Sequence, residues 1–420
     1  MYEKTVLDNG IRILTEKVPG AYSASVGFWV ESGSRYEARA LNGISHFIEH
    51  MLFKGTDRRS ALAIAKEIDS VGGALSAFTN QEFSCYCAKV AGNKLLLAVD
   101  LLSDMLCNSL FDFDDIEKER RVILQELHRI EDSPEDRIHD LLDEALWRDH
   151  PFGQPVLGTS RTVGSFDRSL LLDFFAARYR AGHLVVAAAG DLDHGRLVEA
   201  VGTALTNLPS GFAETLPSIP NNPVRQVRIL NRKLEQVLVG LGMPAPAQND
   251  SRRFAAQILN SILGSSIGSR LFQKLREERG MVYSVYSCLN SFFDHGALVV
   301  HAGMAPDDAA HVVGIILREL MFLKSRLVSA AELQSAKDQL SGQFMLSLEN
   351  TDARMSRLAK NELYRQDVPA PEAVAAAINQ VAAEDILELG KELFRDEVLV
   401  LQMMGNISGD AFSLMDLTLG

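Results

Sequence analysis

An internal repeat is the feature that most constrains the fold of this 420-residue chain. Residues 179–192 match residues 394–407 at a constant offset of 215 (394 − 179), through Leu-Val-Val in the first copy and Leu-Val-Leu in the second. Residues 12–14 and 228–230, both Arg-Ile-Leu, match at an offset of 216 (228 − 12). Small drifts of this kind are typical of loop insertions in a duplicated domain. The chain is therefore expected to contain two copies of one fold.

Each copy combines strands of alternating hydrophobicity with longer helical patterns, which predicts an α+β fold. A Pro-, Ser- and Asn-rich stretch separates the copies and predicts an extended linker. We place the first domain at residues 1–208, the linker at 209–223 and the second domain at 224–420. In the first domain we expect strands at 11–18, 24–31, 74–79, 82–90 and 184–190, and helices at 44–53, 60–71, 94–110, 113–132, 134–148 and 168–180.

The helix predicted near residue 46 carries His46, Glu49 and His50. Two histidines four positions apart leave the same face of a helix, and Glu49 lies on that side too. Histidine is the commonest metal ligand, and a carboxylate beside zinc can take a proton from a bound water. The order His-x-x-Glu-His is the inverted form of a zinc-peptidase signature. Alone, the motif is also compatible with an ordinary helix that carries two histidines and an acid.

A second helix supplies a third possible ligand, Glu126, which follows His50 by 76 residues (126 − 50). Glu119 precedes Glu126 by two helical turns and shares its face. At this point the sequence resembles the pitrilysin or insulinase-type metallopeptidases, which include mitochondrial processing peptidase. In that family His-x-x-Glu-His is followed after this interval by a glutamate ligand, in a segment similar to residues 119–126.

The resemblance covers essentially the whole chain and implies both fold and activity. It implies two tandem domains of the mitochondrial processing peptidase-like fold, each a mainly antiparallel sheet covered by helices. Zn²⁺ would be bound by His46, His50 and Glu126, with Glu49 as general base. Glu119 could hydrogen-bond a zinc-bound histidine from behind. The expected activity is that of a zinc metalloendopeptidase that cleaves peptides or unfolded, presequence-like segments.

The second copy has diverged in its chemistry. No His-x-x-Glu-His occurs near residues 259–262, and Gln343 stands where Glu126 stands in the first copy, at an offset of 217 (343 − 126). The family resemblance implies that Arg276 and Tyr283, which are seven residues apart, contact the substrate. A cation and a phenol are suitable groups to stabilise an oxyanion. The alternative is an ordinary helix-to-strand connection.

The hairpin strand at residues 74–79 resembles the edge strand that pairs with the substrate backbone in the family. Its expected substrate-binding residues are Ala74, Leu75, Ser76, Ala77, Phe78 and Thr79. The family usually has asparagine where this chain has Ser76, so a side-chain contact there does not follow, whereas backbone pairing does not depend on it. A plain hairpin strand is the alternative.

Composition restricts the partners and the compartment. The formal net charge of −13 disfavours nucleic acid and anionic membranes as partners. No run of 18 apolar residues predicts a membrane span, and the first ten residues lack signal-peptide features, so a cytoplasmic location is expected. Cys85 and Cys87 should share one strand face as small apolar residues; a Cys-x-Cys metal pair is the less favoured alternative.

Two further inferences concern assembly and the rival functions. The family closes a chamber with two half-chains, so a homodimer, or a heterodimer with a related chain, is expected. The main rival function is that of a non-catalytic scaffold subunit, as in the core proteins of the respiratory cytochrome bc1 complex. The presence of every expected ligand and of the base argues against it. A non-peptidase zinc hydrolase is a second rival.

Overall fold

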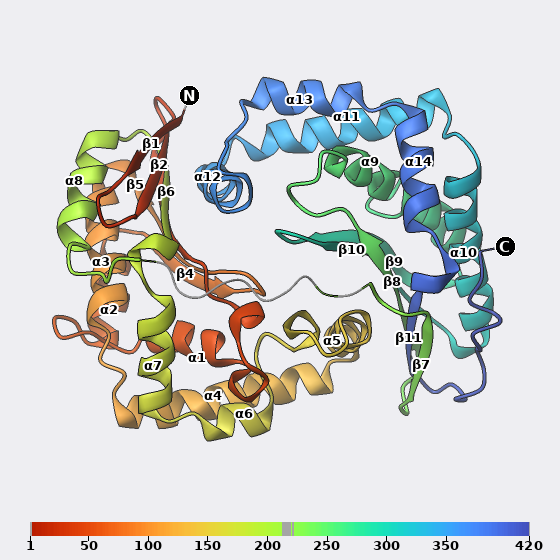
Figure 1. Cartoon of the computed structure of the whole chain (residues 1–420), viewed down its shortest axis with the longest axis horizontal. Coiled ribbons are helices and arrows are strands. Elements are labelled where there is room, and N and C mark those ends of the chain that lie inside the picture. The colour runs from red at the N-terminus through yellow and green to blue at the C-terminus, as the bar shows by residue number, and fades with distance from the viewer. Residues whose placement is uncertain (1, 212–219, 221, 420) are drawn as a thin grey trace. The chain divides into compact units, whose positions relative to one another are not determined.

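The computed structural model describes residues 2–211, 220 and 222–419 (Figure 1). The first half contains β1 (Tyr2–Val6), β2 (Arg12–Lys17), β3 (Ser23–Val30), α1 (Ile44–Met51), α2 (Ala61–Ser70), β4 (Ala74–Thr79), β5 (Ser84–Ala91), α3 (Leu95–Asn108), α4 (Phe113–Asp132), α5 (Pro134–Leu146), α6 (Ser160–Ser165), α7 (Arg168–Arg178), β6 (Leu184–Gly190) and α8 (His194–Ala204). The second half contains β7 (Gln226–Asn231), β8 (Val237–Ala245), α9 (Arg253–Leu263), the π-helical turn η6 (Phe272–Glu277), β9 (Val282–Ser291), β10 (Gly296–Met304), α10 (Ala309–Ser325), α11 (Ala330–Ser347), α12 (Thr351–Arg365), α13 (Pro371–Gln380), α14 (Ala383–Leu393) and β11 (Val400–Gly405).

Each half contributes one sheet, and the two sheets have the same topology. The first has the order β1-β2-β6-β3-β5-β4 and the second has the order β7-β11-β8-β10-β9. In both, one pair is parallel, β2 with β6 and β7 with β11, and every other pair is antiparallel. The predicted α+β fold of two duplicated, mainly antiparallel sheets covered by helices is confirmed. Strand β1, at one edge of the first sheet, is an additional strand beyond the five that correspond to the second sheet.

The chain divides into two compact units that interleave in sequence. Unit 1 comprises Met1–His128, Gln154–Ser218 and Met345–Ala370, and unit 2 comprises Arg129–Gly153, Ile219–Phe344 and Pro371–Gly420. Unit 1 therefore takes α12 from the second half, and unit 2 takes α5 from the first half. This differs from the contiguous domains predicted at 1–208 and 224–420, while most of the predicted linker at 209–223 lies outside the described residues.

The exchanged helices are explained by the faces of the sheets. In unit 1, Phe28 belongs to the core on the α1 and α3 side, whereas Trp29 packs against Met355 and Leu358 of α12 on the other side. In unit 2, the apolar side chains of α5 cover β10 and β11. Successive strand residues point to opposite faces, so a strand that is apolar throughout needs cover on both. The exchanged helix supplies the second cover in each unit.

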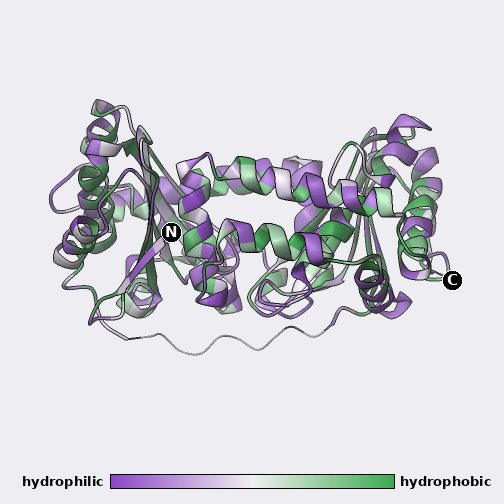
Figure 2. Ribbon diagram, turned by 90° about the horizontal axis from the view of Figure 1, so that it is seen from above, coloured by the Kyte–Doolittle hydropathy of each residue, from purple (hydrophilic) through white to green (hydrophobic). Residues whose placement is uncertain are grey.

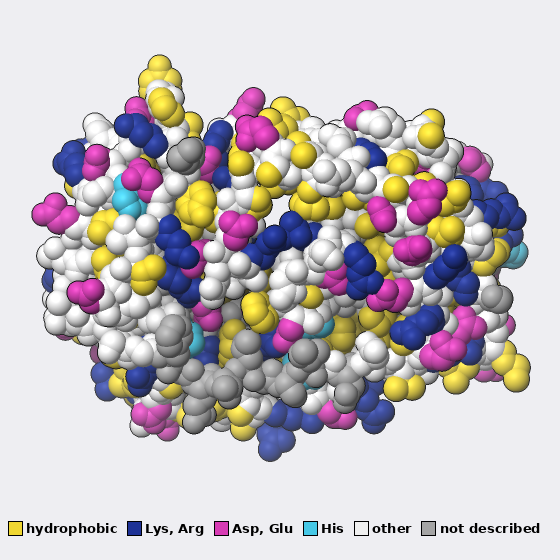
Figure 3. Space-filling model, turned by 45° about the horizontal axis from the view of Figure 1, so that its top comes forward, with side chains coloured by type: hydrophobic (Ala, Val, Ile, Leu, Met, Phe, Trp, Pro, Cys, Tyr) yellow, Lys and Arg dark blue, Asp and Glu magenta, His cyan; other side chains and the backbone are white. Residues whose placement is uncertain are grey.

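Figure 2 shows hydrophobic and hydrophilic residues alternating along the helices of both halves. Ser60 caps α2 by accepting a hydrogen bond from the Ala63 N–H. The segment before Gly280 ends as η6, and Gly280 itself has φ +61°, the left-handed conformation typical of a helix C-terminus. Figure 3 shows charged side chains of both signs intermixed on one face of the molecule.

Candidate metal centre

Helix α1 owes its orientation to one fully apolar face. Ile44, Phe47, Ile48 and Met51 are all buried in the core of unit 1. Their burial, at roughly 25 cal/mol per Å² of apolar surface, fixes which way the helix faces. The helix also packs against the edge strand β4. The polar residues His46, Glu49 and His50 are carried by the same two turns.

Helix α4 brings the third residue of the group. Ile116, Ile123 and Leu127 form its buried face, and Glu119 and Glu126 lie two turns apart along it. Arg120 anchors this helix, since its guanidinium donates hydrogen bonds to the backbone oxygens of Val163 and Phe166. The position of Glu126 is thereby tied to the segment that contains α6 (Ser160–Ser165).

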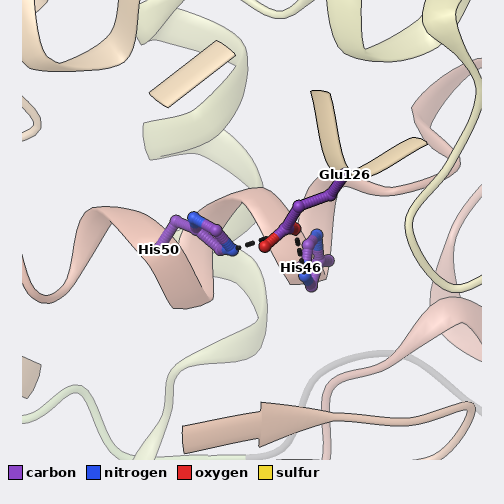
Figure 4. Close-up of side chains that lie close together, drawn as sticks. All are labelled: His46, His50 and Glu126. Atoms are coloured by element: carbon purple, nitrogen blue, oxygen red, sulfur yellow. Dashed lines mark ion pairs between the residues drawn. The ribbon is translucent and has the colours of Figure 1, made fainter. Parts of the chain in front are cut away.

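The three predicted ligands come together in the structure (Figure 4). Oε2 of Glu126 lies 3.8 Å from Nε2 of His46 and 3.7 Å from Nε2 of His50. One ligand atom from each residue lies within 4.8 Å of the other two. Among the described residues, this is the one group of three or more His, Cys, Asp or Glu side chains that could hold a metal ion.

His50 is fixed by a second carboxylate. Its Nδ1 lies 3.0 Å from Oε2 of Glu119, and Oε1 of Glu119 is 2.7 Å from Nζ of Lys54. Burial by itself would raise the pKa of Glu119, but the hydrogen bonds from His50 and Lys54 outweigh it and lower that pKa. An ionised Glu119 accepts the Nδ1 proton of His50 and leaves its Nε2 lone pair directed at Glu126.

His46 and Glu49 are both affected by burial. Desolvation lowers the pKa of His46 to about 3, and the neighbouring His50 adds to this effect, so the imidazole is neutral at physiological pH. Nδ1 of His46 is buried and has no hydrogen-bond partner among the described residues. Desolvation also raises the pKa of Glu49, although the Thr79 hydroxyl opposes this rise. A carboxylate with a raised pKa is suited to accept and return a proton.

The donor set fits zinc. Two imidazole nitrogens and one carboxylate oxygen are the ligands of many catalytic zinc sites, which keep a fourth position for water. Ligands bonded at about 2.1 Å in a tetrahedral site lie about 3.4 Å from one another. The nitrogen-to-oxygen distances of 3.7 and 3.8 Å are close to that value.

The predicted substrate strand, β4, is an edge strand of the first sheet. Leu75 and Ala77 pack toward the core, while Ala74, Ser76 and Phe78 alternate with them and are exposed. Phe78 is 41% exposed and packs edge-on against Trp29. Oγ of Ser76 lies 3.1 Å from Sγ of Cys87 on β5, and Cys85 and Cys87 share one strand face as expected. The free backbone edge of β4 could accept a further strand.

Arg276 and Tyr283 lie together within unit 2. The Arg276 guanidinium donates to the backbone carbonyl of Tyr283 and lies 5.8 Å from the Phe272 ring centroid. The side chain of Tyr283, on the edge strand β9, is 67% exposed. An exposed phenol beside an arginine is compatible with the predicted contact to substrate, which stays a prediction.

Comparison with known proteins shows the family. Residues 12–160 match the family described as insulinase (peptidase family M16), and residues 165–340 match the one described as peptidase M16 inactive domain. The chain belongs to peptidase family M16. An uncharacterized zinc protease of Streptomyces coelicolor is 41% identical over 397 residues, covering 93% of this chain and 86% of the relative. Another from Bacillus subtilis is 35% identical over 399 residues, covering 94% and 97%.

Three solved structures of other proteins have the same fold. A peptidase M16 inactive domain from Pseudomonas fluorescens has a TM-score of 0.90 at 18% identity and covers 96% of this chain and 98% of that one. A protease from Helicobacter pylori has a TM-score of 0.89 at 19% identity, with 96% and 99% covered. Complex III2 from Candida albicans contains a chain with a TM-score of 0.84 at 22% identity, with 99% of both covered. At these identities the likeness concerns the fold alone.

Sequence reasoning missed two residues that support this M16 site. Lys54 follows His50 by four positions, a helical spacing that could have indicated its pairing with Glu119. Glu37 lies in a turn before α1, and nothing in the local pattern indicated its contact with that helix. No helix among the described residues is long and apolar enough to cross a membrane.

Proposed function

We propose that this M16 chain is a zinc-dependent endopeptidase that cleaves peptides or unfolded protein segments. The observation that carries the proposal is that His46 and His50 of α1 converge with Glu126 of α4. Glu49 lies on α1 between the two histidines. Relatives named zinc proteases over most of the chain support it.

The residues of this site would have separate roles in peptide hydrolysis. His46, His50 and Glu126 would hold the ion, which when bound lowers the pKa of water and polarises the scissile carbonyl. Glu49 would take the proton from the attacking water and return it to the leaving amine. Glu119 would keep His50 in the required tautomer and orientation, since it accepts the Nδ1 proton.

The free edge of β4 indicates how a substrate could be held. An extended peptide would add to the sheet as a further strand through backbone hydrogen bonds. Thr79, at the end of this strand, also contacts Glu49, so the strand and the base are neighbours in the fold. Unfolded or short segments would therefore be preferred over folded proteins.

A scaffold role is the alternative that the fold also permits, because a chain of complex III2 shares it. A scaffold has no need of a base, of three converging ligands, or of a carboxylate behind one of them. All of these groups are present in unit 1. This favours the peptidase.

The decisive experiment combines zinc analysis with cleavage of a diverse peptide library, with products read by mass spectrometry. We expect one bound zinc per chain after dialysis against zinc-free buffer, and cleavage that stops on treatment with a chelator. A chain that keeps zinc but cuts no unfolded peptide would favour a different zinc hydrolase. A chain that keeps no zinc would favour the scaffold.

The assembly follows from the same proposal. Unit 2 offers Arg276 and Tyr283, and we propose that in a dimer these groups serve the metal centre of the other subunit. Mixing Glu49→Gln and Tyr283→Phe chains should then regenerate intact sites in the mixed dimers and restore roughly a quarter of parental activity. A mixture no more active than its parts, with subunit exchange verified, would contradict the shared site.

A further inference from the structure

A buried carboxylate outside the metal-binding group holds the first turn of α1. Glu37 is only 2% exposed, and its oxygens face the start of this helix. Oε2 accepts a hydrogen bond from the Gly43 N–H at 2.7 Å, and Oε1 accepts one from the Ser45 N–H at 2.9 Å. Asn42 Nδ2 lies 3.3 Å from Oε2 and also donates to the Pro155 carbonyl at 2.9 Å.

The helix cannot obtain this cap from its own N-terminal residue. The N-cap position is Gly43, which has φ +93° and no side chain. A Cβ there would meet the Leu157 carbonyl oxygen at 2.6 Å, so the Ser, Thr, Asp or Asn that usually caps a helix does not fit. Glu37 reaches in from a preceding turn and satisfies N–H groups that would otherwise lack partners. Burial raises the pKa of Glu37 to about 7, although the hydrogen bonds from the Ser45 and Gly43 N–H groups oppose this rise. In its ionised form the carboxylate also suits the positive end of the helix dipole.

The apolar face of α1 does not fix the helix along its axis. Burial of Ile44, Phe47 and Met51 orients the helix around that axis, but hydrophobic contact is non-directional. Hydrogen bonds of 2.7 and 2.9 Å set an axial position, and Ser45 directly precedes His46. Three residues beyond the other end of the helix, Lys54 forms an ion pair with Glu119 and ties this segment to α4.

We propose that Glu37 is a positioning residue of the metal centre, which sets the axial position of α1 so that His46 and His50 meet Glu126. The inference rests on the proposed zinc function but adds a residue to it. Metal–ligand distances tolerate changes of about 0.2 Å, whereas one residue of helix spans about 1.5 Å. A small slide of α1 would therefore weaken the site without unfolding unit 1.

The test compares the zinc dissociation constants of purified full-length variants by chelator competition. In Glu37→Gln an amide NH2 replaces one acceptor oxygen, and Glu37→Asp keeps the carboxyl group but is one methylene shorter. Both should bind zinc more weakly, by up to roughly 10- to 100-fold, the range known for groups that hydrogen-bond a ligand directly. At saturating zinc, kcat for a peptide should fall while KM stays unchanged, because β4 is intact.

Glu16→Gln is the matched control. Glu16 is also a buried carboxylate of unit 1, but it pairs with Arg354 and Arg357 on α12, away from α1. This variant should lose thermal stability and keep the parental zinc affinity. If Glu37→Gln fails to fold, the zinc affinity of Glu37→Asp tests the positioning role.

The outcomes separate the two proposals. Parental zinc affinity in a folded Glu37 variant would overturn the positioning role and leave the proposed peptidase intact. Equal weakening in Glu16→Gln would show a general effect of stability and would also overturn the role. A parent chain that binds no zinc at all would overturn the proposed function itself.

Discussion

Units 1 and 2 have the same strand order and yet carry different chemistry. In unit 1, the helix after the second strand of the repeat is α1, with His46 and His50, and α4 adds Glu126. In unit 2, the corresponding helices are α9 and α11, and α11 has Gln343 in the place of Glu126. The sheets are preserved because the strands of both copies keep the apolar residues that their cores bury. The candidate metal centre depends on a few side chains, which can change while the shared fold stays the same.

Two acids, Glu119 in unit 1 and Asp143 in unit 2, differ in the direction of their pKa shifts. In unit 1, Glu119 has Lys54 and His50 beside it, and its pKa is lowered despite burial. In unit 2, Asp143 on α5 is partly buried near another acid, Asp140; desolvation, aided by Asp140, raises the pKa of Asp143 to about 7. The difference shows that a partly cationic neighbourhood keeps Glu119 ionised, whereas desolvation and an acidic neighbour favour the protonated form of Asp143.

The largest expected effect is that of removing the base from unit 1. Glu49→Gln should lower kcat by about 10²–10⁴-fold or more while zinc content stays parental, because the ligands remain and the proton acceptor is lost. Peptide cleavage and metal analysis on the same preparation measure both. Near-parental turnover in this variant would remove Glu49 from the mechanism.

The next substitution gives α4 of unit 1 the residue that α11 of unit 2 has at the matching position. Glu126→Gln should lose zinc on dialysis, and activity with it, because a neutral amide oxygen is a poorer ligand than a carboxylate. Gln343→Glu in α11 is the control in the opposite direction and should change neither zinc content nor activity. Full zinc retention by Glu126→Gln would contradict the assignment of the third ligand.

The exchanged helices predict stability effects that cross the sequence halves. Leu358→Ala in α12 and Leu146→Ala in α5 should each destabilise by about 2–5 kcal/mol, because both side chains are fully buried against a sheet. Leu358→Ala should destabilise unit 1, although α12 lies in the second half of the sequence. Hydrogen exchange resolved by peptide can follow each sheet separately. Loss of protection in β7–β11 alone for Leu358→Ala would contradict this packing.

The smallest expected effect concerns pH and unit 2. Because the folded pKa of Asp143 is raised to about 7 from its usual value near 3.8, its contribution favours folding most at low pH and is lost as the pH rises through 7. Asp143→Asn, which cannot ionise, should therefore gain about 2–3 kcal/mol relative to the parent between pH 5 and pH 8. Denaturant unfolding at the two pH values measures the difference, and Asp132→Asn on the exposed end of α4 is the control. A parallel pH response in parent and Asp143→Asn would contradict the burial effect.

The sequence by itself predicted the duplication and the fold class, and it singled out His46, Glu49 and His50 as candidates for a metal centre. It could do so because apolar periodicity is local, and because His46, Glu49 and His50 are neighbours on a single helix. Glu126 required the resemblance to a family, since an interval of 76 residues says nothing of distance in space.

Only the tertiary structure decided which helix covers which sheet. Helices α5 and α12 are amphipathic in the sequence, but their pattern does not say which apolar face they will meet. The same holds for Glu37 and Lys54, whose partners are backbone N–H groups or a carboxylate on another element. Such contacts depend on the path of the chain between elements. Hydrophobic burial is non-directional, so local sequence does not contain that path.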